Sequence, residues 1–174
     1  GRMFAALKSV LGCMEHAHDG RLVASAGIVC AIGIYASFAI AQHSTRMKGK
    51  LRLRWGVVSL LASGCTAWAT HFIVLLAFKP GMPAEFDPIL TAVSLACAVA
   101  GIGAGVSLSL GRRRRRSRQF IAGLAVGLGV TALHYVGQAA YLVQGSVRWN
   151  LWLVIPSVLV SLPISGLSMM AVVA

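Results

Sequence analysis

Long apolar stretches alternate with short polar segments along this chain. Five of them are long enough to cross a bilayer: residues 21–42, 55–78, 89–110, 119–143 and 151–174. Each is close to the roughly 20 residues that a helix needs to span the hydrocarbon core. The stretches are continuously apolar and lack the alternation of strands in a membrane barrel. The pattern therefore predicts an all-α, polytopic transmembrane helix bundle with five spans.

Composition points to the same class of protein. The chain is 57% hydrophobic and only 11% charged, whereas a soluble domain carries about 25% charged residues. Residues 3–14 are also apolar but too few to span a membrane. We therefore expect residues 1–17 to be an outer-side segment, either an interfacial helix or the remnant of a longer one. Residues 18–174 would form the membrane domain.

The basic residues explain the net charge of +12 and predict the topology. Five lie in residues 46–54 and six in residues 112–118, directly after the first and third spans. The positive-inside rule places both clusters in the cytoplasm, and the N-terminus outside. We favour this interpretation over a nucleic-acid surface, and contact with anionic lipids of the bilayer accompanies it.

The chain repeats itself with a period of 63 residues. This register superposes "THF" of the second span on "LHY" of the fourth, so that His71 matches His134. Other pairs follow in the same register: Gly64 with Gly127, Phe72 with Tyr135, Ala77 with Ala140, and Phe78 with Tyr141. The unit is therefore two helices, with two full copies and a truncated third copy from residue 149.

The two histidines lie deep in apolar spans and at matched depth. His71 follows Arg54 by 17 residues and His134 follows Arg118 by 16, which is roughly 25 Å of helix from the cytoplasmic edge. An ionisable residue inside a membrane is a candidate functional residue. The alternative is that each imidazole only bonds a carbonyl or hydroxyl of a neighbouring helix. Two histidines at equal depth favour a shared ligand or metal site.

Small residues predict which way the histidines face. Gly64 precedes His71 by seven residues, and Gly127 and Gly123 precede His134 by seven and eleven. These spacings return to one helix face, and glycines there let helices approach closely. We therefore expect both histidines to point into the bundle.

The repeated helices resemble the bacterial MHYT domain. The resemblance rests on the two histidine motifs, the glycine before each and the Ala-aromatic pair after each. It rests also on the openings His18-Asp19, Phe86-Asp87 and Trp149-Asn150. It covers nearly the whole chain from His18. It implies a sensor in the bacterial cytoplasmic membrane with seven helices, copper bound through the motif Met and His, and a diatomic gas as the signal. It also implies cytoplasmic output domains, including cyclic-di-GMP enzymes, and a homodimer.

The motifs depart from the family pattern. They read Thr70-His71-Phe72-Ile73 and Leu133-His134-Tyr135-Val136. Both methionines are lost, so zinc or no metal at all are alternatives to copper, because thioether ligands select Cu(I). His18 is a candidate third ligand, and Asp87 a candidate partner that orients a ring. Four residues are expected to wall the site or to bond to it: Trp68, Phe72, Tyr135 and Gln138.

Three classes of function remain open. The first is a membrane sensor that signals to an output domain outside this chain, and the second is a transporter of a small solute or metal. The third is a structural subunit whose histidines bind nothing. An enzyme is not expected, since the sequence shows no nucleophile-base pair, paired carboxylates or phosphate loop.

Overall fold

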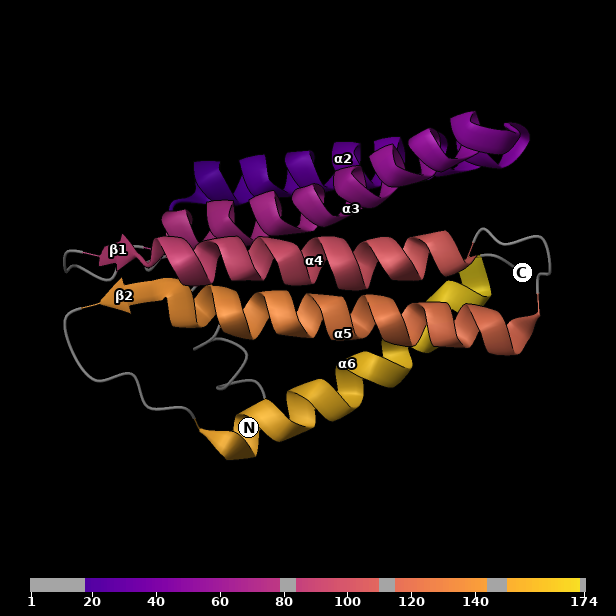
Figure 1. Ribbon diagram of the computed structural model, residues 1–174. Helices are drawn as coiled ribbons and strands as arrows, with labels where there is room; N and C mark the ends of the chain where they lie inside the picture. The colour runs from indigo at the N-terminus through magenta and orange to yellow at the C-terminus, as the bar shows by residue number, and fades with distance from the viewer. Residues whose placement is uncertain (1–17, 79–83, 110–114, 144–149, 173–174) are drawn as a thin grey trace.

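Five long helices make up the fold of the computed structural model, which describes residues 18–78, 84–109, 115–143 and 150–172 (Figure 1). They are α2 (Gly20–Arg46), α3 (Gly49–Ala77), α4 (Pro88–Ser109), α5 (Arg116–Ala140) and α6 (Leu151–Val172). All five are long and apolar enough to cross a membrane. The predicted all-α polytopic bundle is thus confirmed. The predicted N-terminal segment, residues 1–17, lies outside the described residues.

Helices that follow one another in the chain pack side by side. The most extensive contacts join α4 to α5 and α2 to α3, followed by α5 with α6 and α3 with α4. Helix α6 crosses α5 obliquely (Figure 1). Helix α3 also contacts α5 directly, although α4 lies between them in the sequence. This last contact matters for the site, because the two predicted motif helices are α3 and α5.

Three helices, α2, α3 and α5, extend further into the basic stretches than predicted. Helix α2 continues to Arg46 and α3 begins at Gly49, so only two residues connect them. Lysine and arginine are good helix formers, so nothing in these side chains ends the helix. The chain reverses at Gly49, whose φ of 55° suits a residue without a Cβ. The predicted fourth span, in contrast, is too long at its end, because α5 stops at Ala140.

A short antiparallel ladder joins the ends of two helices. Strand β1 (Ala84–Phe86) pairs with β2 (Tyr141–Val143), with Phe86 opposite Tyr141. Residues 141–143 were predicted as helix, and this is a correction. Three-residue strands show no alternation long enough to be recognised in a sequence. We call this end of the bundle the strand end.

The first repeat carries the same connection in reduced form. His18 forms an isolated antiparallel bridge with Phe78. The N–H of Asp19 donates to the carbonyl of Ala77 at 2.8 Å, and the N–H of Asp87 donates to that of Ala140 at 2.8 Å. The predicted 63-residue register therefore corresponds to a repeated hydrogen bond.

The interior combines alanine and serine with a few aliphatic side chains. Ala41, Ala98, Ile102, Val106 and Leu133 form the core cluster. Several buried serines donate to a carbonyl three or four residues earlier in their own helix: Ser37, Ser44, Ser94 and Ser109. Such bonds satisfy hydroxyl groups where no water is available.

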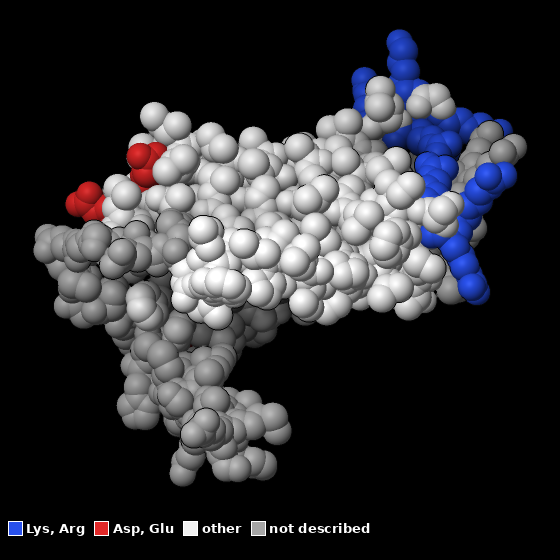
Figure 2. Space-filling view, turned by 90° about the horizontal axis from the view of Figure 1, so that it is seen from below, with Lys and Arg blue, Asp and Glu red and all other residues white. Residues whose placement is uncertain are grey.

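Charge is separated between the two ends of the bundle. Most of the described lysine and arginine residues gather at the end where α2 turns into α3 and α5 begins (Figure 2), whereas the described acidic residues lie at the strand end together with one arginine, Arg21. We call the first of these the basic end. The apolar flanks between them carry exposed leucine, isoleucine and valine, as helices in contact with lipid do.

Candidate functional site

The two predicted histidines lie next to each other near the strand end. His71 and His134 come from α3 and α5, and each lies six residues before the end of its helix. Their ring centroids are 5.3 Å apart, and the ring planes meet at 76°. The repeat accounts for this proximity, because equivalent helices of the two copies present equivalent residues at one depth.

His71 is held between two helices. Its Nε2 atom is buried and has no hydrogen-bond partner among the described residues. The same atom lies over Gly137 of α5, where an added Cβ would approach it to 2.5 Å. Its ring also packs against Phe72 with centroids 5.4 Å apart. Gly137 thus makes room for the imidazole, three residues after His134.

His134 is more accessible than its partner. Its side chain is exposed, and its ring packs against Tyr135 with centroids 5.1 Å apart. The hydroxyl of Tyr135 lies 2.6 Å from Ser157 Oγ of α6. The expectation that both histidines point into the bundle therefore holds for His71 more than for His134.

A row of aromatic rings lines the site on the side of α4. Trp68 packs on Phe72 at 4.9 Å, Phe72 on Phe86 at 5.3 Å, and Phe86 on Tyr141 at 5.3 Å between centroids. Trp68 Nε1 donates to Ser94 Oγ at 3.2 Å and to the carbonyl of Thr91 at 3.3 Å. Trp68 and Phe72 were predicted as walls, and the row runs from them to the ladder.

His18 lies in a separate surrounding. Its ring packs on Phe78 with centroids 5.3 Å apart. It lines a hollow of about 570 Å³ at the strand end, together with Leu75, Gln138 and Tyr141. Its Nδ1 atom is buried, and no residue in the described part of the chain forms a hydrogen bond with it. Among the described residues no three His, Cys, Asp or Glu side chains come together as a metal-binding group, so His18 does not join the pair.

Asp87 is engaged in starting a helix. Its Oδ1 accepts the N–H of Leu90 at 2.8 Å, which is an N-cap bond at the start of α4. Asp19 does the same for α2 through the N–H of Arg21 at 3.0 Å. The predicted role of Asp87 in orienting an imidazole stays a prediction, whereas its capping role is visible. Gln138 faces the hollow with His18.

The three predicted packing glycines lie at helix contacts. A Cβ at Gly64 would collide with Val99 of α4, and one at Gly123 would collide with the carbonyl of Ser165 in α6. A Cβ added at Gly127 would lie 3.1 Å from the Cβ and Oγ atoms of Ser165, which is closer than most Cβ contacts in proteins. All three are buried. Gly137 was not predicted, although its place three residues after His134 on one helix face could have indicated it.

The pair offers two imidazole nitrogens to a ligand. Metal–nitrogen bonds of about 2.0–2.1 Å let two imidazoles hold one ion when their centroids lie roughly 5–6 Å apart. The 5.3 Å between the rings and the unpartnered Nε2 of His71 fit that requirement. The fold and the site together define a polytopic helical membrane protein with a histidine pair near one membrane face.

Comparison with known families now gives the class a name. The family described as the MHYT, or bacterial signalling protein N-terminal, repeat matches residues 64–123 and 127–174. This is more than half of the chain, and the chain belongs to this family. The resemblance inferred from the motifs is confirmed, and the chain is a membrane-spanning signalling region.

Three relatives are signalling proteins. The chain is 34% identical, over 81% of its length, to an uncharacterized signaling protein of Caulobacter vibrioides. It is 32% identical over 83% to the bifunctional diguanylate cyclase/cyclic di-GMP phosphodiesterase MucR of Pseudomonas aeruginosa. It is 29% identical over 68% to the cyclic di-GMP phosphodiesterase NbdA of the same organism.

The matched region is a small part of each relative. It covers 17%, 21% and 15% of the three proteins, respectively. The chain therefore corresponds to a fraction of a longer signalling protein in each case. No solved structure matches it.

Proposed function

We propose that this chain is the sensory membrane region of a cyclic-di-GMP signalling protein and that its ligand binds at His71 and His134. The observation that carries this proposal is the pair itself: two equivalent histidines with ring centroids 5.3 Å apart, one of them with a buried Nε2 that none of the described residues bonds. A buried polar atom without a partner is costly, and a ligand that it binds removes that cost. The chain itself has no catalytic role in this proposal.

The ligand we favour is copper, either as the signal or as the binding group for a diatomic gas. Copper bound here would supply a Lewis-acidic centre with open positions for a small molecule. His71 and His134 would hold it as neutral imidazoles. The family methionines are replaced by Thr70 and Leu133, so the donor set is nitrogen-based and suits Cu(II) or zinc as well.

The charge separation supports an orientation in the membrane. With the basic end in the cytoplasm, as the positive-inside rule requires, the strand end and the histidine pair lie on the outer side. Helix α2 then begins outside, and the N-terminus lies there too. A signal from outside the cell would reach the pair without crossing the membrane.

The output lies outside the chain. MucR and NbdA carry cyclic-di-GMP chemistry in their names, and we propose a similar cytoplasmic partner domain here, working as a homodimer. Ligand binding between α3 and α5 favours one helix packing over another, and the partner domain responds to that shift. The chain would bind no nucleic acid directly.

The test is the metal content of the detergent-purified protein after copper loading, measured by mass spectrometry. We expect copper in the unaltered protein and its loss in the His71→Ala/His134→Ala double variant. His43→Ala is the matched control, because His43 is an exposed imidazole near the basic end, packed on Trp55. Copper retained in the double variant, or absent from the loaded unaltered protein, would refute the proposal.

A further inference from the structure

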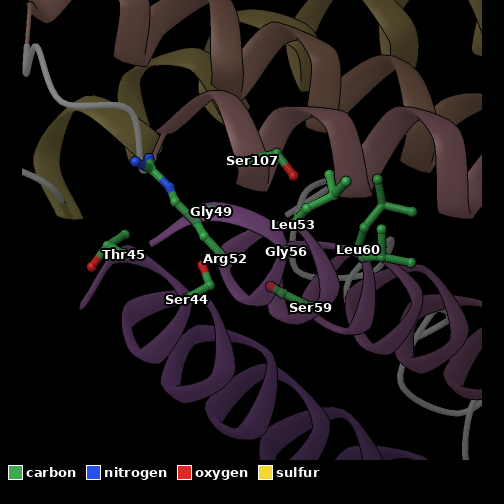
Figure 3. A pocket seen from close by; sticks show the side chains of 10 residues that line it. Ser44, Thr45, Gly49, Arg52, Leu53, Gly56, Ser59, Leu60 and Ser107 are labelled. Atoms are coloured by element: carbon green, nitrogen blue, oxygen red, sulfur yellow. The ribbon is translucent and has the colours of Figure 1, made fainter. Parts of the chain in front are cut away.

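A second hollow lies at the basic end, far from the histidines. It has a volume of about 410 Å³ and lies between the turn of α2 into α3 and the end of α4. Figure 3 shows Ser44, Thr45 and Arg52 on one side of it and Leu53 and Leu60 on the other. The charged side chain therefore lies on one side of the hollow, and the larger apolar side chains lie on the other, where Ser59 and Ser107 also line it.

The polar wall carries a charge without a counter-ion. Arg52 is half-buried. The described acidic residues lie at the strand end, because Asp19 caps α2, Glu85 belongs to β1 and Asp87 caps α4. A guanidinium presents five N–H donors in a planar fork that matches a phosphate group. An anion is therefore the complementary ligand for this wall, and none of the acidic side chains that the structure describes lies at this end.

The apolar wall runs away from the charge into the membrane. Leu53, Val57 and Leu60 follow one another at helical spacing and lie on one face of α3. They begin roughly 6 Å and end roughly 16 Å along the helix from its start at Gly49. Leu53 is 70% exposed and Val57 46% exposed. A small soluble anion makes no apolar contact with such a wall, whereas an acyl chain can pack along it.

We propose that this hollow binds one anionic phospholipid. The lipid phosphate lies at the Arg52 guanidinium, and an acyl chain lies along Leu53, Val57 and Leu60. Gly56 leaves the space between the two walls open, because a Cβ built there meets nothing within 4 Å. The site is independent of the histidine pair and of any metal.

Native mass spectrometry of the full chain, released from detergent with phosphatidylglycerol or phosphatidylcholine, tests this. We expect one retained phosphatidylglycerol and a clear preference over phosphatidylcholine. Arg52→Gln should weaken retention about tenfold, the order expected for a hydrogen bond to a charged group. Arg54→Gln is the control, because it removes the same charge from an exposed residue two positions away that does not line the hollow. If both variants lost phosphatidylglycerol equally, the lipid would be held only by the general positive charge of the basic end, and the proposal would be overturned.

A second variant separates shape from charge. Gly56→Leu fills the hollow without removing a charge and should also release the lipid. Gly27→Leu is its control, since a Cβ at Gly27 likewise meets no described atom within 4 Å, and Gly27 lies on α2, outside the lining of the hollow. Thermal unfolding shows whether both variants are folded. Undiminished retention in Gly56→Leu would overturn the proposal, as would displacement of the lipid by inorganic phosphate at equal concentration.

Discussion

The close contact between the His71 ring and Gly137 can be tested with the Gly137→Ala variant, which adds a single methyl group. In the structure a Cβ at residue 137 would lie 2.5 Å from His71 Nε2 and 2.8 Å from Cδ2, against 3.4 Å for ordinary contact. Gly137→Ala therefore forces the imidazole to move by about 0.9 Å or α3 to move away from α5. Neither movement is free, because the His71 ring also packs on Phe72 and α3 is packed closely on α4 at Gly64.

Overpacking of this kind typically costs about 1–3 kcal/mol. Alanine in place of a helical glycine gains up to about 1 kcal/mol of helix propensity, so we expect a net destabilisation of about 0–2 kcal/mol. The measurement is thermal unfolding in detergent, followed by circular dichroism. The same variant should retain copper about 10–100-fold less tightly, since a displaced ligand ring loses its orientation.

Gly27→Ala is the matched control for this variant. It also adds a methyl group to a helical glycine, but into open space, and it should be neutral or stabilising. The reasoning is refuted if Gly137→Ala is stabilised as much as Gly27→Ala. That result would mean that the ring does not occupy the space over Gly137, whether or not a metal binds.

Three further predictions concern the helices that carry the site. Asp87→Ala should lower the free energy of unfolding by about 1 kcal/mol through loss of the N-cap, whereas Asp87→Asn keeps the capping oxygen; equal losses in urea titrations would contradict the cap. Gly64→Ala should destabilise by about 1–3 kcal/mol through its contact with α4, whereas Gly56→Ala should not; equal melting temperatures would refute this close approach. Gln119→Ala removes the 2.8 Å bond from its side-chain nitrogen to the buried carbonyl of Ser109 and should cost about 1–3 kcal/mol; an unchanged rate of proteolysis at the α4–α5 turn would speak against it.

Hydrophobic pattern alone predicted the five helices because each must satisfy its own backbone and meet lipid. The pattern could not place the helix ends. Arg46 and Arg116 are helical because basic side chains do not interrupt a helix, so charge marks the membrane edge and not the end of the element. The ladder between Phe86 and Tyr141 escaped detection because three residues carry no periodicity.

The repeat predicted the site better than any single motif. It aligned His71 with His134, and these rings are neighbours in the structure. It could not show that His18 packs on Phe78 instead of joining them, because His18 precedes α2 and is placed by a single bridge to Phe78, which leaves no periodicity in the sequence. Gly137 was missed because its register partner, Val74, is not a glycine; its spacing from His134 places it on the same helix face, and the three-dimensional contact shows that it makes room for His71.

The ladder has a mechanical consequence. Helices α2 and α3 are joined by the chain at one end and by the Asp19–Ala77 hydrogen bond at the other, and α4 and α5 are tied in the same way by the chain and by Asp87 and Ala140. Two helices connected at both ends cannot separate at either end, so we expect each pair, α2 with α3 and α4 with α5, to move as one rigid body. The freedom that remains is a pivot along the seam between α3 and α4. His71 belongs to the first pair and His134 to the second. A ligand that draws the two imidazoles together would therefore rotate one helix pair against the other, and because the helices span the membrane, the rotation would reach the basic end.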